Sequence, residues 1–128
     1  MAEHPSATLI REGLRALNRG DIYEMADMLA EDVEWHEIGR AEPIRGKAAL
    51  AALYGGAALP DSEITAELHD VVANDDHAIA LVTATARRGG RTLTYRTAEI
   101  FHVRNGKVTA RWAFSDDTAA INEFFAGT

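Results

Sequence analysis

The spacing of apolar residues divides the chain into a helical first part and a strand-rich second part. Between residues 6 and 29, apolar side chains recur every three or four positions, which predicts two helices separated by a break at 18–20. Ser6 can cap the first helix, and Asp21 followed by Glu24 resembles the capping box that opens a second one. We therefore expect two helices before any strand.

Beyond residue 62 the pattern changes to the alternation of strands. We expect four strands over 64–73, 77–87, 91–104 and 107–115, separated by Asn-Asp-Asp, Gly-Gly and Asn-Gly turns. A short strand over 33–38 and helices over 47–54 and 118–125 complete the prediction. Helices followed by an antiparallel meander indicate an α+β fold, with the helices packed on one face of a curved sheet.

Length and composition fit one ordinary globular domain. The chain has 128 residues, of which 47% are hydrophobic and 26% charged, and no long polar tract. A chain of this length buries roughly two thirds of its unfolded surface and needs no disulfide or metal to fold. We expect a single domain spanning residues 1–128.

The charge and the histidine spacing argue against several function classes. A net charge of −7 repels phosphate backbones and anionic membranes, so we expect no nucleic-acid or membrane partner. The basic cluster Arg87, Arg88 and Arg91 straddles a Gly-Gly turn and is interpreted as a solvated hairpin tip. The histidines other than His36 lack the sequence spacing that is typical of metal ligands. We therefore expect neither a metal nor a cofactor.

Cysteine is absent, so thiolate chemistry and disulfides are not available to this chain. The absence of cysteine fits a reducing compartment, and residues 1–6 lack a basic stretch followed by an apolar run. We expect a cytoplasmic location.

Two predicted hairpins place one carboxylate on a largely apolar sheet face. The Asn-Gly turn at 105–106 pairs Arg104 with Lys107 and, at the same register, sets Glu99 opposite Trp112. The Gly-Gly turn at 89–90 sets Ala80 opposite Glu99. Alternation then puts Glu99 on a face shared by Leu93, Tyr95, Thr97, Phe101, Val103, Val82, Ala84, Ala110 and Phe114.

Glu99 is the only carboxylate of that set. Because desolvation disfavours its charged form, we expect a protonated acid that can donate a hydrogen bond. The row of small residues at 78, 80, 84 and 86 leaves room for a cavity on the same face. Two alternatives stay open: an ion pair with a helix arginine such as Arg11 or Arg15, and a register, shifted by a bulge, that exposes Glu99.

Several segments resemble ketosteroid isomerases and SnoaL-like proteins of the NTF2-like superfamily. They are LAEDVEWHE at 29–37 with RGKAAL at 45–50, LNRGD at 17–21, and VRNGKV at 103–108 with Trp112. Together these segments cover nearly the whole chain. The resemblance implies a cone-shaped fold with N-terminal helices on a curved, mostly antiparallel sheet around a pocket for a small apolar molecule.

The resemblance also implies two catalytic residues. Aligned without gaps over 29–54, Glu37 falls where ketosteroid isomerase carries its carboxylate base, and Glu99 falls at the buried acid that stabilises the dienolate oxygen. Gly13 stands where the isomerase has a tyrosine that completes the oxyanion hole, so ordinary steroid isomerisation is not expected. Tyr95 is a candidate for the missing hydroxyl donor.

Seven residues are expected to line the pocket and bind substrate: Trp35, Tyr54, Val82, Tyr95, Phe101, Trp112 and Phe114. The Trp-His pair at 35–36 also resembles SnoaL-like cyclases. Strict alternation points His36 away from Glu37, which favours a structural or interface role for this histidine.

Two hypotheses follow for the function. The first is a cofactor-free acid/base enzyme of the isomerase, cyclase or dehydratase type, acting on a small carbonyl compound such as a polyketide, terpenoid or steroid-like molecule. The second is a non-catalytic module that binds a small ligand or acts by dimerising. Under either, a semi-apolar outer sheet face is suited to pairing with a second copy.

Overall fold

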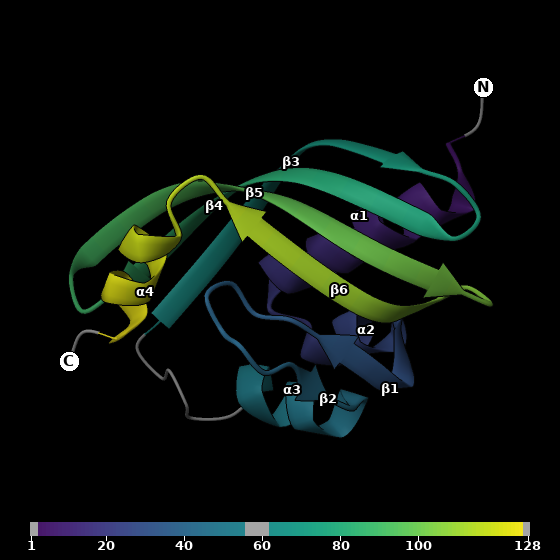
Figure 1. The fold of residues 1–128 in the computed structure, drawn as a ribbon, viewed down its shortest axis with the longest axis horizontal. Coiled ribbons are helices and arrows are strands. Elements are labelled where there is room, and N and C mark those ends of the chain that lie inside the picture. The colour runs from purple at the N-terminus through teal and green to yellow at the C-terminus, as the bar shows by residue number, and fades with distance from the viewer. Residues whose placement is uncertain (1–2, 56–61, 127–128) are drawn as a thin grey trace.

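The computed structural model describes residues 3–55 and 62–126 and shows helices on one side of an open six-stranded sheet (Figure 1). The helices are α1 (Pro5–Arg19), α2 (Ile22–Asp27), α3 (Lys47–Gly55) and α4 (Thr118–Ala126). The strands are β1 (Leu29–Trp35), β2 (Ile44–Arg45), β3 (Ser62–Ala73), β4 (His77–Arg88), β5 (Arg91–Arg104) and β6 (Lys107–Ser115). The predicted α+β architecture is confirmed.

The strands lie in the order β2-β1-β6-β5-β4-β3, and all neighbouring pairs are antiparallel except β1 with β6. The prediction placed the first strand at 33–38, but β1 begins at Leu29 and ends at Trp35. The prediction from the sequence included neither β2 nor the parallel pairing of β1 with β6. Glu37 consequently lies in the segment that follows β1, and not within a strand.

The helix α1 covers the inner face of the sheet and lies behind it in Figure 1. Ile10 of α1 has no exposed surface and belongs to the same core as Ala80, Val82 and Phe101. Burial of this apolar stripe holds the helix on the sheet, at roughly 25 cal/mol for each Å² of apolar surface removed from water. The helix begins two residues earlier than expected, because His4 and not Ser6 is its cap: His4 Nδ1 accepts the Ser6 N–H at 3.0 Å.

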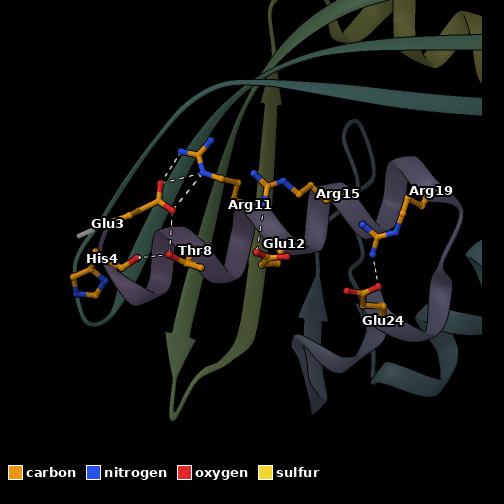
Figure 2. A network of polar contacts seen from close by, with 8 residues as sticks. All are labelled: Glu3, His4, Thr8, Arg11, Glu12, Arg15, Arg19 and Glu24. Atoms are coloured by element: carbon orange, nitrogen blue, oxygen red, sulfur yellow. Dashed lines mark hydrogen bonds and ion pairs between the residues drawn. The ribbon is translucent and has the colours of Figure 1, made fainter. Parts of the chain in front are cut away.

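The outward side of α1 is polar and carries a row of ion pairs (Figure 2). Arg11 pairs with Glu3 at 2.7 Å, and Arg15 pairs with Glu12 at 3.4 Å. Exposed pairs of this kind add little to the free energy of unfolding, because solvent screens them. Both arginines are therefore engaged at the helix surface, and neither is the partner of Glu99 that one alternative invoked.

Register along the long strands follows the two turns, with one exception. The Gly-Gly hairpin pairs Arg88 with Arg91 and Ala80 with Glu99, as predicted. In the Asn-Gly hairpin, with Asn105 at φ 52° and Gly106 at 74°, Arg104 pairs with Lys107, but a bulge follows directly. Beyond it Glu99 lies opposite Ala113, so the predicted pairing of Glu99 with Trp112 is wrong by one residue.

The helix α4 lies beside the tip of the β4–β5 hairpin (Figure 1). Arg91 Nη2 donates to the Phe124 carbonyl at 3.2 Å, and Arg88 Nη1 donates to the carbonyls of Phe124 and Phe125. Positive side chains at the carboxyl end of a helix satisfy its last carbonyls and its dipole. The cluster lies at a hairpin tip where Arg87 and Arg91 are exposed, as predicted, but Arg88 and Arg91 also bind the end of α4, which the sequence did not indicate.

Candidate functional site

A buried ion pair between neighbouring strands occupies the inner face of the sheet. Glu99 of β5 and Arg111 of β6 are only 9% and 8% exposed, and Arg111 donates to Glu99 Oε1 from Nη2 at 2.8 Å and from Nε at 3.2 Å. The Thr97 hydroxyl donates to Oε2 at 3.0 Å. Glu99 thus accepts three hydrogen bonds. The prediction that purely apolar side chains surround it, and that it acts as a hydrogen-bond donor, is wrong.

The bulge in the β5–β6 hairpin explains why the sequence pattern did not predict that Arg111 lies beside Glu99. Without a bulge, even-numbered residues of β6 share the face of Glu99, and Arg111 faces away. With the bulge, Arg111 pairs with Phe101 and lies on the inner face, while Ala110 directly before it is also buried. The one sequence signal was the isolated carboxylate itself, because a buried charge needs a partner.

Trp35 and His36 hold the guanidinium of Arg111 from the other side. The Arg111 Cζ lies 4.5 Å from the centroid of the Trp35 ring, and Nη1 donates to the His36 carbonyl at 3.1 Å. Trp35 is 7% exposed, as expected for a residue of the pocket wall or core, and no described residue accepts a hydrogen bond from its indole N–H. The guanidinium is therefore fixed by a carboxylate, an aromatic face and a backbone carbonyl.

Tyr95 lies within electrostatic reach of this pair and of Glu37. Burial is the largest cause of a raised pKa for Tyr95, the carboxylates of Glu99 and Glu37 raise it further, and Arg111 opposes them. The phenol consequently keeps its proton at neutral pH, and no described residue hydrogen-bonds to its oxygen. It can donate to an acceptor on a ligand.

Glu37 also lines a hollow at one end of the sheet. This hollow, of about 260 Å³, is bordered by residues 36–40, by 112–115 at the end of β6 and by Thr118 of α4. A second hollow, of about 400 Å³, lies between α1 and β3 and contains none of the predicted site residues. Glu37 is half-buried at the first hollow, and Glu99 lines neither.

The structure divides the residues predicted to bind substrate into three groups. Val82, Phe101 and Trp35 are buried on the inner face with Glu99, and Tyr95 is half-buried there. Trp112 and Phe114 pair with Ile100 and Ala98, so both lie on the outer face and their predicted place beside Glu99 is wrong. The side chain of Tyr54, in α3, falls outside the described residues.

The ring of His36 lies on the outer face of the sheet. It stacks on the Trp112 ring with centroids 4.7 Å apart and planes 13° apart. Its Nε2 lies 3.3 Å from Glu34 Oε1 but makes no hydrogen bond with a described residue. This orientation agrees with the structural role expected from alternation.

Neither a metal site nor a membrane-spanning helix is found among the described residues, 3–55 and 62–126. No group of three histidine, aspartate or glutamate side chains is arranged to hold a metal ion. None of the described helices has the length and apolar character needed to cross a bilayer.

Comparison with known proteins relates this chain to one domain family. Residues 10–111 match the SnoaL-like domain. A Mycobacterium tuberculosis protein, Rv0034, is 32% identical over 138 aligned residues, covering 98% of this chain and 100% of that protein. Bal32a, from a soil-derived mobile gene cassette, is 30% identical with a TM-score of 0.84, over 94% of this chain and 96% of its own. A proposed polyketide cyclase from Xanthomonas campestris is 25% identical with a TM-score of 0.75, over 95% of each chain.

Proposed function

Because the chain belongs to the SnoaL-like family and has an NTF2-like fold, we propose that it is a cofactor-free acid/base enzyme acting on a small, apolar carbonyl compound. The reaction is of the isomerase, cyclase or dehydratase type, on a polyketide, terpenoid or steroid-like molecule. The observation that carries the proposal is the buried ion pair of Glu99 and Arg111 on the inner face of the sheet, whose charges act, together with that of Glu37, on the Tyr95 phenol.

A purely structural explanation of this cluster is weak. Removing two charges from water costs several kcal/mol for each ion, and an apolar pair of similar volume is often as stable or more so. Interior groups that interact electrostatically and shift the pKa of a neighbour are typical of functional sites. The resemblance to a polyketide cyclase supports the same class of substrate.

Each group has a role in this proposal. The Glu37 carboxylate takes a proton from the carbon next to the carbonyl, and the electron pair of that C–H bond moves to the carbonyl oxygen to give an enolate. The Tyr95 hydroxyl donates to that oxygen, and the positive charge of Arg111 stabilises the developing anion. Glu99 and Trp35 orient Arg111. Protonated Glu37 then returns the proton to a second carbon, which completes an isomerisation.

The experiment is a thermal-shift screen of the wild-type protein against steroids, aromatic polyketides, terpenoids and short enones, followed by turnover assays on every compound that binds. A ligand at 100 times its dissociation constant adds about 2.7 kcal/mol, a shift of several degrees in Tm. Glu37→Gln should keep binding and lose turnover. Glu42→Gln, an exposed glutamate in the same segment, is the matched control and should behave as wild type.

One observation favours the second hypothesis, a non-catalytic ligand-binding module. The place of the isomerase tyrosine is closed in this chain, since a Cβ on Gly13 would lie 1.9 Å from the Met28 Sδ. The helix α1 therefore supplies no hydroxyl to the interior from this position. A ligand that stabilises the protein but is never turned over would select this hypothesis.

The outer face of the sheet supports the proposal of a homodimer. Two adjacent rows of mostly apolar side chains cross it, Val72-Ile79-Ile100-Trp112 and Leu81-Ala98-Phe114. Four large apolar residues of these rows are 39–58% exposed: Val72, Ile79, Leu81 and Phe114. A face of this kind can pair with its own copy across a twofold axis, as in other symmetric oligomers.

A further inference from the structure

We propose that His36 is a positioning residue whose ring, anchored on the outer face of the sheet, fixes Arg111 and Glu37 of the interior site. The inference rests on the proposed function only in the roles given to Arg111 and Glu37. The contacts themselves join the two faces of the sheet through one residue.

The backbone of His36 both donates a hydrogen bond to Arg111 and accepts one from it. The His36 N–H donates to the Arg111 carbonyl at 2.8 Å, and the Arg111 Nη1 donates to the His36 carbonyl at 3.1 Å. The pairing of β1 with β6 ends at Trp35 and Arg111, so His36 is the first residue beyond the regular ladder. Its position depends on these two bonds and on its own side chain.

The side chain of His36 is held by outer-face groups. One side of the imidazole stacks on Trp112, and Nε2 lies 3.3 Å from Glu34, which Arg45 also approaches at 3.8 Å. Trp112 is in turn packed by His102, with ring centroids 4.8 Å apart. Stacked pairs of this kind add stabilisation beyond that of their buried area.

Glu37 follows His36 directly, outside any strand. Two residues further on, Gly39 has a φ of 77° and packs closely on Asn122 of α4. The ring of His36 is therefore the last side chain clamped on the sheet before the proposed base. Removing this clamp should loosen the 36–37 segment and, with it, the guanidinium that the His36 carbonyl holds.

The test follows the Arg111 Nε–H by ¹⁵N NMR in the full-length protein, with Arg111→Lys identifying its signal. In the wild type, this N–H donates to Glu99 at 3.2 Å and should exchange slowly with solvent. In His36→Ala the signal should broaden or shift, with exchange at least about 10-fold faster because the local opening free energy falls. His36→Phe, which keeps the stack, should retain the slow wild-type signal.

His102→Ala is the matched control, since it removes another ring that packs on Trp112 and leaves the stack of His36 on Trp112 in place. It should leave the Arg111 signal as in the wild type. If His36→Ala does not fold, Trp112→Leu removes the stacking partner instead and should give the same loss.

An unchanged signal in folded His36→Ala would overturn the proposal, and so would equal losses in His36→Phe or His102→Ala. The readout uses no substrate, so its outcome is separate from that of the proposed function. A protein in which His36 behaves as expected but no carbonyl compound reacts would refute the enzyme proposal alone.

Discussion

Glu99 and Arg111 form an ion pair on the inner face of the sheet, with Arg111 Nη2 2.8 Å from Glu99 Oε1 and both side chains about nine-tenths buried. They come from neighbouring strands, and Thr97, Trp35 and the His36 carbonyl complete the arrangement. The charges of the pair act on the neighbouring Tyr95: Glu99 raises the pKa of the phenol and Arg111 lowers it.

Removing one partner of this pair should destabilise the protein strongly. Arg111→Leu leaves a buried carboxylate without its cation, and we expect a loss of about 3–5 kcal/mol in the free energy of unfolding. The double variant Glu99→Leu/Arg111→Met should recover most of that loss, because no charge is then left buried. Urea denaturation of the single and double variants checks this, and additive losses would contradict it.

The pKa of Tyr95 should report the charge cluster. Glu99→Gln and Glu37→Gln each remove a carboxylate that raises this pKa, so both should lower it, while Arg111→Leu should raise it further. A pH titration of tyrosine labelled with ¹³C at Cζ measures the pKa directly. Glu42→Gln, which alters an exposed glutamate, is the control and should leave the pKa of Tyr95 as in the wild type.

The same raised pKa predicts a loss of stability in base. In the window between the unfolded and the folded pKa of Tyr95, the unfolded chain binds fewer protons than the folded one, so the free energy of unfolding falls as the pH rises. The contribution is complete below the unfolded value, near 10, and is lost as the pH passes the folded value. Tyr95→Phe should remove this part of the pH dependence.

Gly13→Ala should destabilise the protein although alanine is the better helix former. The helix propensity gained is about 1 kcal/mol, but the new Cβ would lie 1.9 Å from the buried Met28 Sδ. We expect a net loss of about 1–2 kcal/mol, typical of overpacking, in thermal unfolding. In the background of Met28→Ala, the same substitution should become neutral or stabilising, and a loss that persists there would show that the clash is not its cause.

Charge placed on the outer face should dissociate the proposed dimer. Leu81→Glu puts a carboxylate in the middle of the apolar rows, and we expect a monomer by sedimentation where the wild type is a dimer. Tyr23→Glu alters an exposed residue of α2 and serves as the control. A wild-type monomer at all concentrations would rule out this interface.

Much of the fold could be predicted because local turns fix long-range pairs. The Gly-Gly and Asn-Gly turns gave the bounds of β5 and β6 and the pairing of Ala80 with Glu99. The resemblance to SnoaL-like and NTF2-like proteins is confirmed by the match over residues 10–111 and by the solved structures.

The candidate site could be predicted only in part, because one bulge exchanges the two faces to which the side chains of β6 point. Alternation cannot reveal an extra residue near Thr109, and that residue moves Arg111 inward and turns Trp112 and Phe114 outward. The parallel pairing of β1 with β6 was equally hidden, since no hairpin turn connects them. The isolated carboxylate indicates that Glu99 needs a partner, but long-range geometry decides which residue that partner is.

The most direct test of the proposed function is proton exchange at carbon. Each carbonyl compound that stabilises the wild-type protein is incubated with it in D₂O, and mass spectrometry follows deuterium incorporation next to the carbonyl. The proposal predicts incorporation above the buffer rate, lowered about 10²- to 10⁴-fold in Glu37→Gln and unchanged in Glu42→Gln. For every bound compound, incorporation at the buffer rate together with the absence of any isomerised product would contradict it, and so would an equal rate in Glu37→Gln.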